Sequence, residues 1–201
     1  MQKDTFNVSE LFPVDFAKNA WESVVLEDKR KKIIRSLIIQ QYESSRYNDI
    51  IPGKGQGLIG LFAGGPGCGK TLTVEAVAEE TQKPLYMVSA GELGLEAETV
   101  DRRLSRILDI SQRWNAILLL DEADVFLQHR NRLDLHRNSI VSIFLRRLEY
   151  FKGIMILTTN RVDDCDPAFE SRSLIPPLNH QVERGSQDTQ VVFIFPSSST
   201  S

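Results

Sequence analysis

The chain has 201 residues, of which 41% are hydrophobic, 25% charged and 8% aromatic, and this composition excludes a collagen, a mucin or a wholly disordered chain. The 24 Lys and Arg and the 27 Asp and Glu give a net charge of -3, so no global basic field attracts nucleic acid or an acidic membrane. No apolar run approaches the roughly 20 residues that span a bilayer. We therefore expect one large soluble domain inside the cell, cytoplasmic or nuclear, with no nucleic-acid or membrane partner.

The chain begins with a segment that shows no clear period, and residues 1–20 are expected to be an extended lead-in. Residues 27–42 have isoleucine and leucine at helical spacing between charged residues, which predicts an amphipathic helix. A cluster of Pro and Gly predicts a loop at 49–57. Apolar runs and helical patterns then alternate: the expected strands are 58–63, 83–89, 116–120 and 153–158, and the expected helices are 71–81, 99–113 and 137–150.

This alternation predicts an α/β domain in which helices cover both faces of a central parallel sheet. The domain is expected to cover residues 21–173. Residues 174–201 contain Pro176-Pro177, one apolar burst at 191–195 and a Ser/Thr-rich end, so they are predicted to form a disordered tail.

A glycine-rich motif lies between the first expected strand and the next helix. GGPGCGKT, residues 64–71, fits the pattern G-x-x-x-x-G-K-[ST], in which glycines let backbone N–H groups surround a triphosphate. Lys70 would place its charge on the β and γ phosphates, and Thr71 would offer its hydroxyl to Mg²⁺. A structural glycine turn is the alternative, which the strand-to-helix context disfavours. The predicted nucleotide-binding residues here are Gly64, Gly65, Pro66, Gly67, Cys68, Gly69, Lys70, Thr71 and Leu72.

Polar residues follow two of the later expected strands, at the strand ends where open α/β sheets bind ligands. Asp121 would hold Mg²⁺ through water, and Glu122 would orient and polarise the attacking water. Alone, such a pair could equally be a turn or a helix cap, but the upstream phosphate loop favours the functional interpretation. Asn160 follows the next strand and is predicted to sense the γ-phosphate and the water. Arg172 lies beyond it, with a surface salt bridge as its alternative role.

Taken in order, GGPGCGKT, ILLLDEAD, LTTNR and DPAFESR resemble the core of an AAA-type AAA+ ATPase over about residues 20–173. The amino-acid sequence of residues 53–80 is similar to that of a group of uncharacterised fungal AAA proteins. The resemblance implies a P-loop NTPase αβα sandwich of three layers that binds ATP and Mg²⁺, hydrolyses ATP and assembles into a ring or with other AAA subunits. It also implies the remodelling of a protein substrate.

Site roles follow from the same resemblance. It makes residues 64–71 the Walker A loop, Asp121 and Glu122 the Walker B pair, and Asn160 the sensor-1 residue. Arg172 would be the arginine finger that acts on the nucleotide of a neighbouring subunit. The family packs its adenine at the position of Asp49, Ile50 and Ile51.

Three features depart from the family pattern. Many family members have two finger arginines, whereas only Arg172 has a match here. The pore loop of the family usually has an aromatic residue before an aliphatic residue and glycine, whereas segment 90–95 has Leu93-Gly94 but no aromatic residue. The residues after Ser173 do not resemble the helical lid, which we expect to be missing. The alternative function is therefore a nucleotide-binding but hydrolytically impaired module that acts as an interaction or regulatory subunit. Another P-loop class, such as a kinase, would need a substrate-binding insertion that the sequence does not show.

Overall fold

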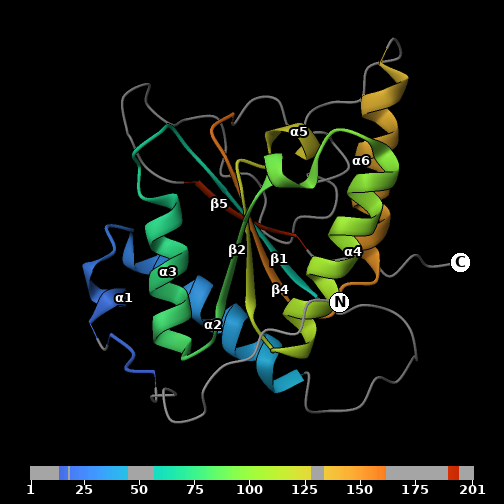
Figure 1. The fold of residues 1–201 in the computed structure, drawn as a ribbon. Helices are drawn as coiled ribbons and strands as arrows, with labels where there is room; N and C mark the ends of the chain where they lie inside the picture. Colours follow the sequence, from blue (N-terminus) through green and yellow to red (C-terminus); the bar gives the residue numbers. More distant parts are fainter. Residues whose placement is uncertain (1–13, 18, 45–56, 128–133, 162–189, 195–201) are drawn as a thin grey trace, which may run out of the picture.

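The structure, a computed structural model, describes residues 14–17, 19–44, 57–127, 134–161 and 190–194. Figure 1 shows helices on either side of a central sheet. The α-helices are α1 (Ala20–Ser23), α2 (Asp28–Ser44), α3 (Lys70–Thr81), α4 (Ala97–Arg113), α5 (Asp124–Leu127) and α6 (Leu135–Glu149), and a 3₁₀ turn, η2, spans Ala90–Leu93. Within the described residues, no helix is both long enough and apolar enough to cross a membrane.

The sheet contains five strands in the order β2-β3-β4-β1-β5. The strands are β1 (Leu58–Ala63), β2 (Leu85–Ser89), β3 (Ile117–Asp121), β4 (Ile154–Thr159) and β5 (Gln190–Ile194). Strands β1 to β4 run parallel to one another, with Ala63 opposite Thr159 and Leu120 opposite Leu157. Because β4 lies between β1 and β3, the carboxyl ends of these three strands meet at one edge of the sheet.

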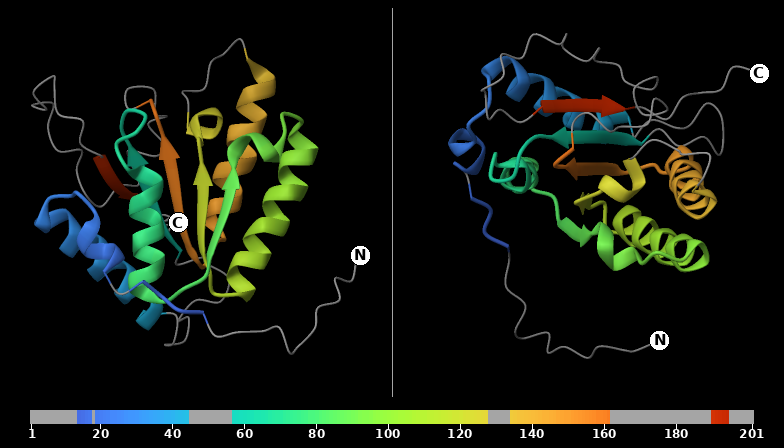
Figure 2. Two further views of the ribbon diagram at one scale, coloured as in Figure 1. Left: turned by 60° about the vertical axis from the view of Figure 1, so that its left-hand side comes forward. Right: turned by 90° about the horizontal axis from the view of Figure 1, so that it is seen from above.

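Each face of the sheet packs against its own helices, so the fold has three layers (Figure 2). Alternate residues of the central strands point to opposite faces, and both faces are covered, which is why β1 and β4 are buried along their whole length and are apolar apart from Thr158 and Thr159 at the end of β4. One face packs against α4, α5 and α6 in a core that includes Ile59, Leu120, Leu157, Leu104 and Phe144. The other packs against α2 and α3 in a core that includes Phe62, Leu119, Ile156, Ile38 and Val77.

The α/β fold and the parallel arrangement of the four expected strands are confirmed, with small differences at the ends of the elements. The prediction of a disordered tail is wrong for Gln190–Ile194, which form β5 and pair antiparallel with β1. The apolar burst in this segment is long enough to make an edge strand. Helix α5 and the turn η2 were not expected, since elements of four residues are too short to show a helical period.

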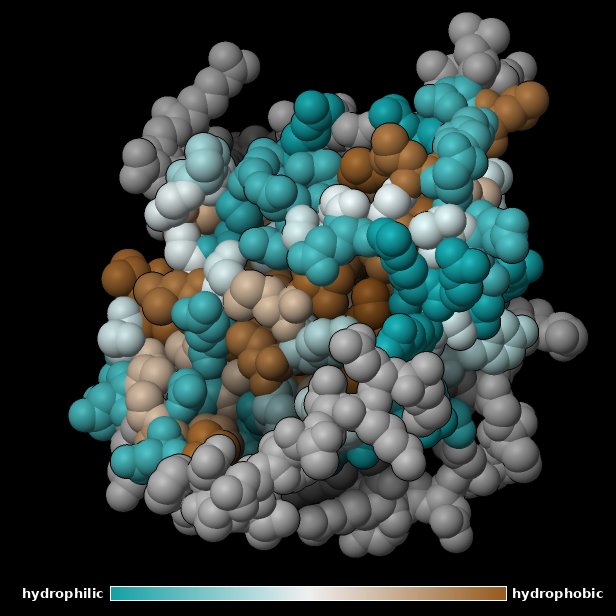
Figure 3. Space-filling view, in the orientation of Figure 1, coloured by the Kyte–Doolittle hydropathy of each residue, from teal (hydrophilic) through white to brown (hydrophobic). Residues whose placement is uncertain are grey.

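The view in Figure 3 shows apolar residues near the middle of one face, where β2 lies between α3 and α4. Met87 of β2 is 45% exposed there. In the described part of the chain, β2 has a strand neighbour on one side, which is β3. The apolar surface in the middle of this view therefore lies over the outer strand on this side of the sheet, and hydrophilic residues cover much of α4 and α6 beside it.

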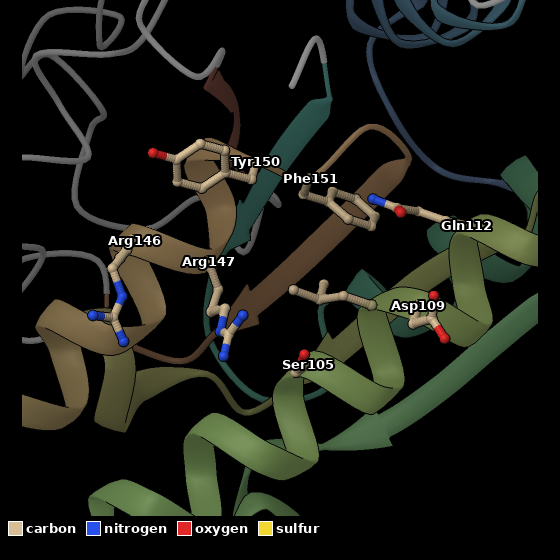
Figure 4. A pocket seen from close by; sticks show the side chains of 8 residues that line it. Ser105, Asp109, Gln112, Arg146, Arg147, Tyr150 and Phe151 are labelled. Atoms are coloured by element: carbon tan, nitrogen blue, oxygen red, sulfur yellow. The ribbon is translucent and has the colours of Figure 1, made fainter. Parts of the chain in front are cut away.

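A bidentate ion pair joins α4 to α6. Arg147 Nε donates to Asp101 Oδ1 at 2.8 Å, and Arg147 Nη2 donates to Asp101 Oδ2 at 2.7 Å. Hydrogen bonding to Arg147 holds the pKa of Asp101 below its ordinary value of 3.8 and raises the pKa of Arg147. Figure 4 shows Arg147 reaching from α6 toward α4 at a surface pocket of about 380 Å³. The pair therefore fastens two helices of the same layer.

Asp101→Asn is expected to lower the free energy of unfolding at pH 7 by about 1 kcal/mol, because a bidentate pair exceeds the usual value of exposed pairs but stays partly screened. The two side chains are 29% and 35% exposed. Because the folded pKa of Asp101 is the lowered one, its contribution is full above pH 3.8 and is lost as the pH falls through the folded value. Urea unfolding at pH 7 and at about pH 3 measures both effects.

The matched control is Asp109→Asn, which removes an i,i+4 pair with Arg113 on the same helix. Its side chains are 57% and 73% exposed, so solvent screens the pair more strongly. We expect a clearly smaller change in the urea midpoint for this variant. Equal losses for the two variants would contradict the role of Asp101 as a fastener between helices.

Candidate nucleotide-binding site

A pocket of about 380 Å³ lies at the edge of the sheet where β1, β3 and β4 end. The loop after β1 and the start of α3 contribute Pro66, Gly67, Gly69, Lys70, Thr71 and Leu72 to its wall. The opposite wall is made by Asp121, Glu122, Thr158 and Asn160, from the ends of β3 and β4. The sheet order therefore brings the predicted phosphate loop, the acidic pair and the amide of the predicted sensor to one pocket.

The loop between β1 and α3 has the backbone that a phosphate cradle needs. Gly67 and Gly69 have φ of 77° and 85°, a conformation that side chains disfavour, and a Cβ at either position would meet no atom within 4 Å. Gly69 is the N-cap of α3, which has no side-chain cap and no acidic residue in its first turn. The positive end of the helix and its first N–H groups are therefore available to an anion.

Lys70 is the link between the two walls. Its side chain is buried, and its Nζ donates to the carbonyl oxygens of Gly64 and Gly65 and to Asn160 Oδ1, each at 2.9 Å. Cys68 Sγ lies 3.6 Å from the same Nζ. The ammonium group is thus held within hydrogen-bonding distance of both the phosphate loop and the end of β4.

The end of β3 is fastened to the end of β4 by side chains. The hydroxyl of Thr158 donates to Asp121 Oδ1 and accepts a hydrogen bond from the Glu122 backbone N–H at 3.0 Å. One residue further along, the hydroxyl of Thr159 donates to Asp124 Oδ1. Glu122 has a φ of 56°, in the left-handed region, and its side chain is exposed at the pocket.

The donor set of this pocket fits Mg-ATP. The Lys70 ammonium and the start of α3 could supply positive charge for phosphate, while the Thr71 hydroxyl, and the Asp121 carboxylate through water, could hold Mg²⁺. Among the described residues there is no cluster of three or more His, Cys, Asp or Glu that could hold a metal ion.

Some predicted site residues lie outside the described residues, namely Asp49, Ile50 and Ile51 of the adenine segment and Arg172. Conversely, sequence reasoning assigned no role to Thr158, although it lines the pocket and contacts both members of the acidic pair. The sequence alone carried no signal for this contact, because it depends on the register of β3 against β4, in which Leu120 lies opposite Leu157.

The position of Cys68 leads to a labelling prediction. The thiol is half-buried in the loop that would wrap the phosphates, so bound Mg-ATP should cover it. In a Cys165→Ser background, N-ethylmaleimide should modify Cys68 about tenfold more slowly with Mg-ATP at ten times its Kd, because protection follows the bound fraction. Mass spectrometry of the labelled peptide measures the rate. Equal rates with and without Mg-ATP would contradict the placement of the nucleotide against this loop.

Comparison with known proteins identifies the family. Residues 60–176 match the family described as "ATPase family associated with various cellular activities (AAA)". The mouse protein "ATPase family gene 2 protein homolog B" is 36% identical over 120 residues, which cover 54% of this chain and 16% of the mouse protein. The fission yeast "Probable mitochondrial chaperone bcs1" is 30% identical over 161 residues, which cover 76% of this chain and 34% of that protein.

A third relative, the "ATP-dependent zinc metalloprotease YME1 homolog" of Caenorhabditis elegans, is 30% identical over 132 residues. These cover 58% of this chain and 18% of the worm protein. The matched segments therefore span between 16% and 34% of these three relatives. The family match includes the phosphate loop, the acidic pair and the end of β4. The chain belongs to the AAA family of ATPases.

Proposed function

We propose that this chain binds Mg-ATP and hydrolyses it to ADP and phosphate. The observation that supports this most directly is the meeting of Lys70, Asn160 and the acidic pair around one pocket of about 380 Å³. The names of the relatives describe ATPases or ATP-dependent enzymes in two of the three cases above. Hydrolysis by this chain is an inference from its own residues.

Each residue of the pocket has one task in this proposal. Lys70 neutralises charge on the β and γ phosphates, and Thr71 with Asp121 holds Mg²⁺, which stabilises the charge that develops on the phosphates. Glu122 orients the attacking water and takes its proton, while Asn160 contacts the water or the γ-phosphate with its amide. Leu72, which is 56% exposed beside the loop, offers an apolar surface for the adenine.

The proposal extends to parts of the chain outside the described residues. Asp49, Ile50 and Ile51 would contact the adenine. Arg172 would reach the nucleotide of a neighbouring subunit and stabilise charge in the transition state, which requires self-association or assembly with other AAA subunits. A cytoplasmic or nuclear location remains a prediction from composition, and it can be measured by microscopy of the tagged chain.

Coupling of hydrolysis to the remodelling of a protein substrate would bring the substrate to residues 90–95, the predicted pore-loop position. The predicted pore-loop position forms η2, and Leu93 within it is fully buried in the core. Leu95, two residues later, is 69% exposed and is the apolar side chain available to a substrate at this turn. A substrate would therefore meet Leu95 rather than Leu93.

Phosphate release across a series of protein concentrations tests the proposal, with Glu122→Gln as the inactive control. We expect specific activity to rise with protein concentration, because an arginine supplied by a neighbour requires association. Activity that persists in Glu122→Gln at the level of the wild type would contradict the catalytic role of Glu122. Binding of Mg-ATP without turnover would instead support the alternative, a nucleotide-binding module with an interaction or regulatory role.

A further inference from the structure

Thr158 occupies a special position in the pocket. It lies at the end of β4, is 1% exposed, and contacts the two residues to which the proposed function gives the magnesium and water roles. Its hydroxyl is shared between the Asp121 carboxylate and the Glu122 backbone N–H. None of the tasks described above uses this hydroxyl.

The chemistry of the partners fixes the direction of both hydrogen bonds. A backbone N–H can only donate, so the Thr158 oxygen accepts from Glu122 at 3.0 Å. An ionised carboxylate can only accept, so the single hydroxyl proton points to Asp121 Oδ1. The hydrogen bond therefore holds Oδ1 of Asp121 in place and restrains rotation of the carboxylate group. The second carboxylate oxygen is left to accept from a magnesium-bound water.

The bond to Glu122 acts on a strained backbone. Glu122 has a φ of 56°, which is uncommon for a residue with a side chain. The two bonds to Thr158 lie on either side of this turn, since the Glu122 N–H reaches the hydroxyl and the Ala123 N–H reaches the Thr158 carbonyl at 2.8 Å. The carbonyl contact survives any substitution at 158, whereas the hydroxyl contact needs Thr or Ser.

The neighbouring threonine has separate partners. The Thr159 hydroxyl donates to Asp124 and accepts from the Arg161 N–H at 3.0 Å, so it does not contact the acidic pair. The Thr158 hydroxyl therefore contacts Asp121 and Glu122, whereas the Thr159 hydroxyl contacts Asp124, further along the chain after β3.

We propose that Thr158 is a positioning residue for ATP hydrolysis. Its hydroxyl orients the Asp121 carboxylate for Mg²⁺ and holds the Glu122 backbone in the conformation that presents the Glu122 side chain to the pocket. This inference rests on the proposed function, because it concerns the alignment of the same acidic pair.

The test compares Thr158→Val with Thr158→Ser in the full chain. Valine keeps the β-branched shape but leaves Asp121 and the Glu122 N–H without the hydroxyl, whereas serine keeps the hydroxyl. We expect Thr158→Val to lower kcat by about tenfold or more and to weaken ATP binding several-fold in Mg²⁺ but not in EDTA. Thr158→Ser should retain kcat and magnesium dependence within about threefold of the wild type.

The matched control is Thr81→Val, which removes a hydroxyl that donates within helix α3, to the Val77 carbonyl at 2.7 Å. It should leave kcat and the magnesium dependence unchanged. Binding of a fluorescent ATP analogue, with and without Mg²⁺, reports on alignment of Asp121 independently of turnover. Circular dichroism and unchanged binding in EDTA verify that Thr158→Val is folded.

Two results would overturn the positioning role. The first is a wild-type kcat together with wild-type magnesium dependence in Thr158→Val. The second is a loss of kcat or of magnesium dependence in Thr158→Ser as large as the loss in Thr158→Val. Failure of the proposed function has a different signature. If the wild type binds Mg-ATP without hydrolysing it, hydrolysis is refuted, while the magnesium-dependent binding of the variants still decides the role of Thr158 toward Asp121. If the wild type binds no Mg-ATP, both inferences are refuted.

Discussion

Replacing Glu122 with Gln should lower the rate of phosphate release by about 10²- to 10⁴-fold while Mg-ATP stays bound. Glutamine has the size of glutamate and keeps the backbone N–H that donates to Thr158. It lacks the negative charge and the basic oxygen that would polarise the attacking water. Phosphate release at saturating ATP, together with binding of a fluorescent ATP analogue, separates the chemical step from affinity.

The control for this variant is Glu75→Gln, which makes the same chemical change on the exposed surface of helix α3. Both variants should have the same thermal unfolding midpoint and the same affinity for Mg-ATP as the wild type. Turnover in Glu122→Gln within a fewfold of the wild type would remove Glu122 from the catalytic role. A loss of affinity alone would place it in binding rather than in activation of water.

Lys70→Met has the opposite signature, since it should weaken Mg-ATP binding about 10- to 100-fold, the usual range for loss of a hydrogen bond to a charged group. Methionine retains the apolar stem of the buried side chain but supplies no charge for the phosphates. It also leaves the carbonyls of Gly64 and Gly65 and the amide oxygen of Asn160 without their shared donor. Titration with a fluorescent ATP analogue measures the change.

Lys32→Met is the control, because it makes the same chemical change at an exposed position on α2. This position is far in the sequence from the residues that line the pocket. It should bind Mg-ATP like the wild type. Equal affinities for Lys70→Met and the wild type would show that the buried ammonium does not contact the phosphates. Together, the Lys70 and Glu122 variants distinguish a site that fails to bind from one that fails to react.

The parts of the fold that could be predicted are those in which one local pattern has one structural solution. The apolar run of residues 58–63 is buried on both faces in β1, as expected for a strand covered by two helical layers. The spacing of GGPGCGKT predicted a turn between strand and helix, and positive φ angles occur at Gly67 and Gly69. The family and the α/β class followed from these motifs.

The parts that could not be predicted depend on pairing between distant segments. Strand β5 pairs with β1 on the side opposite to β4, and nothing within residues 190–194 specifies antiparallel pairing with that side of β1. The contact of Thr158 with the acidic pair depends on the register of β3 against β4, which a single sequence does not reveal. Likewise, the apolar Leu93 gives no local sign that it enters the core through η2 rather than facing a substrate.

The central place of β4 has a consequence for local unfolding. Because β4 provides the hydrogen-bond partner for β1 on one side and β3 on the other, the loop after β1 and the acidic pair after β3 belong to the same cooperative unit. Neither wall of the pocket can separate from β4 without breaking a ladder in the buried middle of the sheet. Backbone amides that pair in the ladders of β1, β3 and β4 should therefore exchange with solvent only through openings that approach global unfolding, and the pocket should lose its shape when the domain loses its fold.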